Sequence, residues 1–215
     1  LRDRAKGLAY KIYGALSLGW QGTVSEWRHY RRFYLYMAGI ATPLVLSVHS
    51  VVSWDFALAI VPGWHSTIFA PYFVAGAIFS GVAMVITLMI PLRWAFGLEA
   101  YITKNHFENM AKLILLTSSI VGFAYATEFF LAYYSADPIE IESFRWRAFG
   151  AYALPFWTMV FCNVVVPQAL WFRKIRRSLP ALFAMTIFIN IGMWYERFVI
   201  IVTSLAHEYD PASWG

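Results

Sequence analysis

The chain has 215 residues, of which 60% are hydrophobic, 19% aromatic and only 13% charged, and its mean hydropathy is +0.56. Soluble globular domains carry about 25% charged residues, so the composition excludes an ordinary soluble domain and indicates a polytopic membrane protein. The formal net charge is +5. No basic patch interleaved with aromatic residues accompanies this charge, so the sequence does not favour nucleic-acid binding.

Five apolar stretches are long enough to cross a bilayer, which takes about 20 residues. They cover residues 33–57, 68–92, 110–134, 148–172 and 179–206. The sequence therefore predicts an all-α fold, a polytopic transmembrane helical bundle. Residues 1–32 are predicted to be a cytoplasmic or interfacial segment, in which 8–24 is too short and too rich in glycine for a sixth span. Residues 207–215 are predicted to form an outer-side tail.

The basic residues predict the orientation of these spans. Of the 17 Lys and Arg residues, seven precede the first span, three lie at 93–112 and four at 173–177. Five crossings place these three segments on one side of the membrane, which the positive-inside rule makes the cytoplasmic side. The outer side receives the connections 58–67 and 135–147, where Arg145 and Arg147 are exceptions to the charge pattern.

Cys162 is the only cysteine of the chain. A lone cysteine excludes an internal disulfide, a zinc site built from thiolates and an iron–sulfur cluster held by this chain alone. We therefore expect any redox centre to be a bound ligand or to belong to another subunit. The sequence starts LRDRAKG, without an initiating methionine, so we expect it to begin inside a longer protein.

Away from the inner ends of the predicted spans, five Asp, Glu, His, Lys or Arg residues lie within them: His49, Asp55, Glu128, Glu196 and Arg197. An unpaired charge in hydrocarbon costs at least about 2.5 kcal/mol, so such residues are candidates for function. Counting about 1.5 Å per residue from the ends of the spans places all five in the outer half of the membrane. A site built from them would open toward the outer surface and release protons there.

Each of these residues also has a purely structural interpretation. His49 and Ser53 share a helix face, so the imidazole can be a hydrogen-bonded packing group. Asp55 can cap the following loop, and Glu196 can simply form a buried ion pair with the adjacent Arg197. Asp55 lies about 120° around the helix from His49, so the two share a cavity only if it wraps the helix end.

Glu128 has no basic neighbour in the sequence, which weakens the structural interpretation for this residue. His65 lies in a predicted outer loop and is expected to be solvated. Four further residues are expected to be packing or interhelical hydrogen-bonding groups: Cys162, Asn163, Gln168 and Asn190.

Three stretches carry a family resemblance. The sequence HSVVSWDFALAIVPGWHSTIFAPYFVAGAIFSG at 49–81 resembles the core signature of the NrfD-like, or polysulfide reductase, membrane subunits. YATEFFLAYYS at 125–135 and NIGMWYERFVIIV at 190–202 match the same family, so the resemblance covers most of the chain from about residue 7. Within the family, PGWHSTIF is most similar to the ActC subunit of alternative complex III, a quinol-oxidising complex.

The resemblance implies a longer chain with two related four-helix bundles, of which the five spans here would form one bundle and part of a second. It implies no covalently bound cofactor and no metal in this chain, and quinol, with menaquinol the expected form, as the substrate. Iron–sulfur clusters and haem c are expected in partner subunits. The expected partners are an iron–sulfur subunit on the outer face, cytochrome c subunits and a related membrane subunit, in a bacterial inner membrane.

The resemblance also implies roles for individual residues. His49 and Asp55 are the catalytic candidates, because an imidazole and a carboxylate can accept the two protons of a quinol. Quinol-binding or proton-path roles are expected for Ser53, Trp54, Glu128, Tyr133, Glu196 and Arg197, and ring contacts for Phe56 and Phe129. Two alternatives stay open: a proton-translocating or transport subunit, and a structural membrane anchor without a site of its own.

Overall fold

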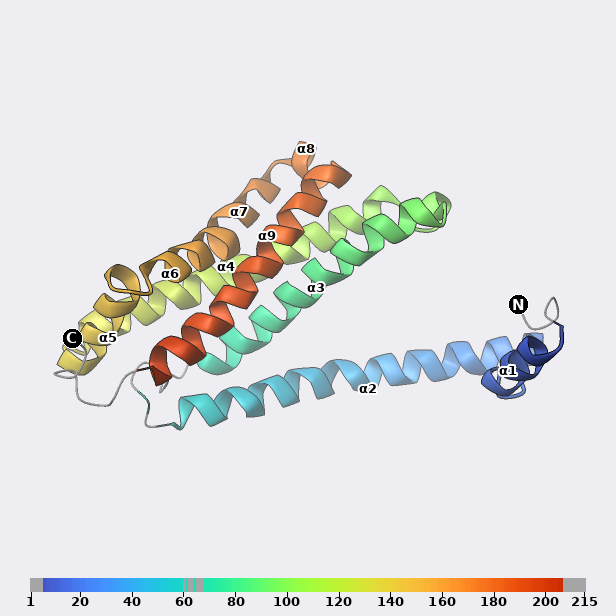
Figure 1. Ribbon diagram of the computed structural model, residues 1–215, viewed down its shortest axis with the longest axis horizontal. Coiled ribbons are helices and arrows are strands. Elements are labelled where there is room, and N and C mark those ends of the chain that lie inside the picture. Colours follow the sequence, from blue (N-terminus) through green and yellow to red (C-terminus); the bar gives the residue numbers. More distant parts are fainter. Residues whose placement is uncertain (1–5, 60, 62–63, 65–67, 207–215) are drawn as a thin grey trace. The chain divides into compact units, whose positions relative to one another are not determined.

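The computed structural model describes residues 6–59, 61, 64 and 68–206, which are helical over most of their length (Figure 1). The chain divides into two compact units, residues 1–47 and 48–215, and the long helix α2 (Val24–Ala57) runs through the boundary between them. Five helices are long and apolar enough to cross a membrane. The predicted all-α polytopic fold is therefore confirmed.

The first unit contains α1 (Leu8–Leu16) and the first part of α2. A capping box begins α2: the Glu26 carboxylate accepts a hydrogen bond from the Thr23 backbone N–H at 2.8 Å, and Thr23 Oγ1 accepts one from the Glu26 N–H at 3.3 Å. The helix therefore starts well before residue 33. The predicted span started later because three arginines of the first turns, Arg28, Arg31 and Arg32, are too polar for an apolar stretch.

The second unit contains a four-helix bundle (Figure 1). Its members are α3 (Phe69–Ala95), α4 (Lys104–Tyr134), the span that runs from α6 (Ala153–Val160) to the 3₁₀ turn η4 (Ala169–Trp171), and α9 (Leu179–Phe198). Helix α3 packs against α4 and α9, and α6 packs against α9. Helix α7 (Val166–Gln168) lies within the span from α6 to η4, and the connecting turns are η2 (Leu98–Ala100) and α8 (Arg173–Arg176).

Buried apolar side chains form two clusters in this bundle. The first joins the C-terminal half of α3 to the N-terminal halves of α4 and α9, and its members include Phe79, Ile86, Phe107, Ile114 and Ile189. The second lies toward the other end, and its members include Phe69, Phe73, Val121, Phe156 and Val199. The polar residues described below lie in and beside the second cluster.

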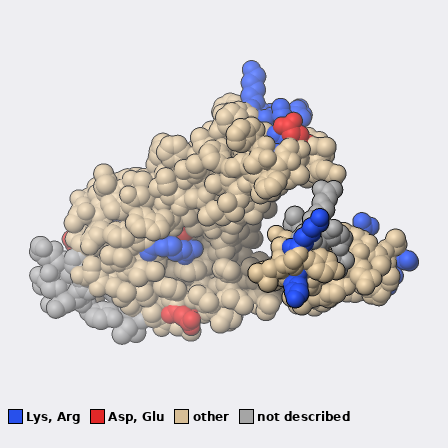
Figure 2. All heavy atoms as spheres, turned by 45° about the vertical axis from the view of Figure 1, so that its right-hand side comes forward, with Lys and Arg blue, Asp and Glu red and all other residues tan. Residues whose placement is uncertain are grey.

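Charged side chains are few on the surface of the bundle, as the mostly tan view in Figure 2 shows. At the end predicted to be cytoplasmic, Glu108 lies 3.7 Å from Arg173 and 3.2 Å from Arg177. Both arginines are exposed, whereas the Glu108 carboxylate that they share is buried. The pairs do join α4 to the basic turn at 173–177.

Helix α5 (Pro138–Phe149) is the largest difference between the structure and the predicted elements. Its charged sequence had favoured a connection between two spans. The Asp137 side chain caps the helix by accepting a hydrogen bond from the Ile139 N–H at 2.9 Å, and Pro138 occupies the first helical position. Gly150 ends α5, so the fourth span begins at Ala153 instead of residue 148. Helix α5 carries Arg147 back against the bundle.

Two segments of the bundle are wound as π-helix: η3 (Phe161–Val165) and η5 (Val199–Thr203). Such turns occur frequently at functional sites. Gly192 allows α9 to approach η3 closely, because a Cβ at this position would lie 2.3 Å from Asn163 Oδ1 and 2.5 Å from Cys162 Cβ. No side chain fits between the two segments at this point.

We expect Gly192→Ala to lower the free energy of unfolding by about 1–3 kcal/mol, because the added methyl group must displace Asn163 and Cys162. Gly81→Ala is the matched control. Gly81 lies in α3 with no atom within 4 Å of the added Cβ, so alanine should be neutral or stabilise by up to about 1 kcal/mol. Thermal unfolding in detergent measures both variants, and a wild-type Tm for Gly192→Ala would contradict the close approach.

Candidate functional site

The carboxylate of Glu196, on α9, lies at the centre of a buried polar cluster. Its side chain is 1% exposed, and Oε2 accepts hydrogen bonds from the Tyr125 hydroxyl at 2.5 Å and from Asn163 Nδ2 at 3.1 Å. Arg197 Nη2 lies 3.9 Å from the other oxygen, Oε1. Burial of a carboxylate is tolerated when it is both hydrogen-bonded and paired, and Glu196 meets both conditions.

Neighbouring helices hold the partners of Glu196 in place. The Ser118 hydroxyl of α4 donates a hydrogen bond to the backbone carbonyl of Asn163 at 2.8 Å, which fixes the π-helical turn against α4. Asn163 Nδ2 also donates to the Tyr125 hydroxyl oxygen at 3.2 Å. The cluster therefore joins three spans of the bundle through neutral hydrogen-bonding groups and a single carboxylate.

A second ionic pair lies nearer to the end of the bundle. Arg147, from α5, lies 3.9 Å from the Glu128 carboxylate and donates a hydrogen bond to the Ser204 hydroxyl at 3.0 Å. Burial lowers the pKa of the Arg147 guanidinium, and the Glu128 carboxylate opposes this shift. Arginine has an ordinary pKa above 12, so Arg147 stays charged. Glu128 thus has a basic partner that is distant in the sequence and close in space.

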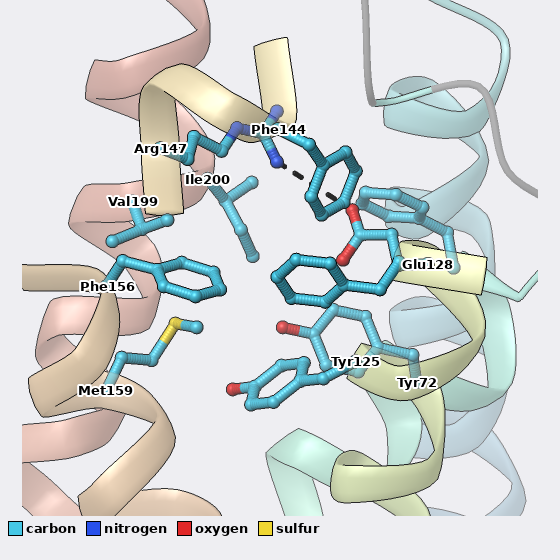
Figure 3. Close-up of a pocket in the computed structure, with 11 residues that line it drawn as sticks. Tyr72, Tyr125, Glu128, Phe144, Arg147, Phe156, Met159, Val199 and Ile200 are labelled. Carbon is cyan, nitrogen blue, oxygen red and sulfur yellow. Dashed lines mark ion pairs between the residues drawn. The ribbon is translucent and has the colours of Figure 1, made fainter. Parts of the chain in front are cut away.

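A small pocket lies beside both pairs, with Arg147 entering from α5 above the Glu128 carboxylate and two tyrosines entering below it (Figure 3). It is lined by Phe69, Tyr72, Tyr125, Glu128, Phe129, Phe144, Arg147, Phe156, Met159, Val199 and Ile200. The volume open to the centre of a water molecule is about 20 Å³. One water needs about 10–15 Å³, whereas ligand pockets measure about 300–1,000 Å³, so a water fits and a quinol ring does not.

The predicted catalytic residues lie on the last turns of α2. His49 is half-buried, whereas Asp55 is exposed and forms no hydrogen bond or salt bridge with another described residue. Ser53 is buried and donates a hydrogen bond to the Ser50 carbonyl at 2.6 Å. Trp54 is exposed. None of these four predicted residues lines the pocket beside Glu128.

The aromatic residues at the end of α2 and in the following connection pack on the bundle. Phe56 stacks against Phe69 and packs with a tilted ring against Phe73, and its ring centroid lies 4.9 Å from that of Trp64. Trp64 Nε1 in turn donates a hydrogen bond to the Ile200 carbonyl in η5 at 3.0 Å. The end of α2 is therefore linked to the π-helical turn that follows Glu196. His65 and the tail 207–215 lie outside the described residues.

The other predicted site residues are divided between two places. The structure brings Glu196 and Arg197 together, as the adjacent positions predicted, and it places Glu128 in the wall of the pocket. Tyr133 is exposed near the end of α4. Asn163 forms interhelical hydrogen bonds as predicted, and so does Asn190, whose Nδ2 donates to Thr87 Oγ1 at 3.1 Å.

Three residues of the site had no role in the sequence interpretation: Tyr72, Tyr125 and Arg147. One signal was available, because Tyr125 and Glu128 are three residues apart on a helix and therefore share a face. Nothing in the sequence paired Arg147 with Glu128. Within the described part of the chain, no three His, Cys, Asp or Glu side chains are grouped to hold a metal ion.

The fold and the site define a multi-pass integral membrane protein in which Glu128, Arg147, Glu196 and Arg197 lie toward one end of a four-helix bundle. The family model of polysulphide reductase, NrfD, matches residues 8–207, and the chain belongs to this family. Members are membrane subunits of quinol-linked oxidoreductase complexes and act with iron–sulfur subunits. No curated protein matches the sequence.

Proposed function

We propose that this chain is the quinol-binding and quinol-oxidising membrane subunit of an electron-transfer complex of the alternative complex III type, in a bacterial inner membrane. It takes menaquinol from the bilayer, passes the electrons to an iron–sulfur subunit on the outer face and releases the protons outward. Cytochrome c subunits and a related membrane subunit complete the assembly. Electrons leave through a partner, because the single cysteine of this chain cannot ligate a cluster.

The position of Glu128, Arg147 and Glu196 together at one end of the bundle is the observation that carries this proposal. Glu128, Arg147 and Glu196 all lie in or beside the second apolar cluster, at the end where α2 also finishes. Quinol oxidation yields two electrons and two protons, so the head group needs proton acceptors and an exit for the protons. We assign the accepting roles to His49 and Asp55, and the buried carboxylates to the subsequent proton transfers.

The quinol ring binds outside the small pocket, because the pocket admits about one water. The exposed side chains of Trp54 and Asp55 offer an aromatic surface and a carboxylate at the end of α2. In this proposal a neighbouring subunit closes the site over these residues. The His49 imidazole accepts one proton, and the Asp55 carboxylate accepts the other or passes it outward.

A second candidate is a proton-translocating subunit. Neutral polar residues continue from the Glu196 region toward the other end of the bundle: Asn190 donates to Thr87, and Thr87 donates to Thr186 Oγ1 at 3.0 Å. Hydroxyl groups in such a series can pass protons if waters join them. This candidate requires a continuous path between both sides of the membrane, whereas quinol oxidation requires only the outer end.

Photolabelling of the intact complex tests the proposed function. We expect a photoreactive quinol analogue to label the peptide that contains residues 49–56, and excess quinol to prevent this labelling. The N-terminal turns of α9, residues 179–185, are the internal control and should stay unlabelled. The same preparation should reduce an electron acceptor with quinol and contain an iron–sulfur protein. A complex that holds both subunits but neither labels at 49–56 nor oxidises quinol would contradict the proposal.

A further inference from the structure

Glu196 is enclosed by protein, so a proton can reach or leave it only through a neighbouring group. Two side chains hydrogen-bond its Oε2 atom, Tyr125 and Asn163. The amide nitrogen of Asn163 only donates, whereas the Tyr125 hydroxyl can donate one proton and accept another. Arg197 stays charged near Oε1 and is not a carrier. The Tyr72 hydroxyl also lies within hydrogen-bonding reach of Glu196. The Tyr125 hydroxyl lies 2.5 Å from Oε2 and is therefore the group best placed to carry the proton.

Tyr125 also lines the pocket that contains Glu128. The two residues lie three positions apart on α4 and so share a helix face. The pocket has room for about one water, and its polar lining residues are Tyr72, Tyr125, Glu128 and Arg147. Figure 3 shows the two tyrosines on one side of the Glu128 carboxylate and Arg147 on the other. A water there has the polar partners that a buried water requires.

Glu128 differs from Glu196 in its access to the surface. Its side chain is 27% exposed, against 1% for Glu196. Arg147 holds the carboxylate near the end of the bundle and is itself tied to Ser204. A proton that arrives at Glu128 can therefore leave toward solvent, whereas one on Glu196 cannot do so directly.

We propose that Tyr125 and one water in the pocket connect Glu196 to Glu128 as a proton relay toward the outer surface. The protonated Glu196 carboxyl gives its proton to the Tyr125 oxygen while the Tyr125 hydroxyl gives its proton to the water, and the water gives a proton to the Glu128 carboxylate. One proton moves from Glu196 to Glu128, and no electrons move. The inference rests on the proposed function for the source of the proton.

The charged and titratable groups that surround this relay are Tyr72 on α3, Tyr125 and Glu128 on α4, Glu140 and Arg147 on α5 and Arg197 on α9. The two arginines favour the ionised form of the carboxylate beside them, whereas burial among apolar side chains disfavours it. The charge of each carboxylate is therefore set by two opposing effects.

Time-resolved infrared spectroscopy after a pH jump, on the purified complex without quinol, tests the relay. The carboxylic acid band of Glu196 is identified by its loss in Glu196→Gln. We expect Tyr125→Phe and Glu128→Gln each to slow the appearance and decay of this band at least about tenfold, because each removes one carrier. Tyr134→Phe is the matched control, since Tyr134 is an exposed tyrosine of the same helix, and it should leave the rate unchanged.

Wild-type protonation rates in Tyr125→Phe and Glu128→Gln would overturn the relay, as would the absence of a Glu196 band in the wild-type complex. Tyr125→Phe removes a hydrogen bond from a buried carboxylate, which can prevent assembly. If Tyr125→Phe does not assemble, Glu128→Gln provides an independent test. The measurement uses no quinol. A negative result for the relay therefore does not contradict quinol oxidation. A failure of quinol labelling, in turn, does not change how the relay measurement is interpreted.

Discussion

His49→Leu and Asp55→Asn are each expected to lower quinol oxidation by the assembled complex about 100-fold, the usual order for the loss of a general base. Both variants should still assemble. Asp55 is exposed, so its amide leaves the packing unchanged, and His49 is a half-buried helical residue for which leucine is a good helix former. The loss should therefore appear in turnover and not in the amount of complex.

Quinol-dependent acceptor reduction, normalised to intact complex, measures this effect together with the affinity for a quinol-site inhibitor. His29→Leu is the control, because His29 is an exposed histidine near the other end of the same helix. If both variants instead lost assembly while each remaining complex turned over normally, His49 and Asp55 would be packing groups. The quinol site would then have to be sought nearer to Glu128 and Glu196.

Arg147→Met is expected to lower the free energy of unfolding by about 3 kcal/mol, because it leaves Glu128 without a cation and the Ser204 hydroxyl without its donor. The double variant Arg147→Met/Glu128→Met should recover most of this loss, since no unpaired charge remains in the bundle. Arg145→Met is the control: Arg145 is 65% exposed, and its pair with Glu142 should contribute about 0.5 kcal/mol or less.

Thermal unfolding of the wild type, Arg147→Met, Glu128→Met and the double variant in the same detergent gives the double-mutant cycle. The coupling between Arg147 and Glu128 is the difference between the loss in the double variant and the sum of the losses in the two single variants. If the double variant is less stable than Arg147→Met alone, the pair is not the reason for burying either residue. In that case the hydrogen bond to Ser204 and the contact of Arg147 with the Phe144 ring would account for the contribution of Arg147 to stability.

The spans could be predicted because length and apolar content alone separate membrane helices from other segments. Helix α5 could not, because its glutamates and arginines resemble a solvated connection. A local signal was nevertheless present, since Asp137 followed by Pro138 is typical of a helix start. The start of α2 at Val24 was missed for a similar reason: the capping box of Thr23 and Glu26 begins a helix regardless of polarity.

The buried ionisable residues could be predicted one by one, but not their partners. Glu196 and Arg197 are adjacent, so their pair was accessible from the sequence. Tyr125 and Asn163 come from other spans. Helical periodicity predicts which residues share a face of one helix, but it does not predict which other helix packs against that face. Asn163 in addition lies in a π-helical turn, which a period of 3.6 residues does not describe.

The two π-helical turns also limit how the length of this chain can vary. A π-helical turn holds one residue more than an α-helical turn, so deleting a single residue within 161–165 would allow ordinary α-helical winding and leave the later residues near their present faces. Deleting a residue from an α-helical part of the same span would instead rotate every later residue by about 100°. Leu170, which is buried, would then turn away from the bundle, and the basic turn at 173–177 would leave Glu108. The π-helical turn is therefore the place where this span can lose a residue without a change of register.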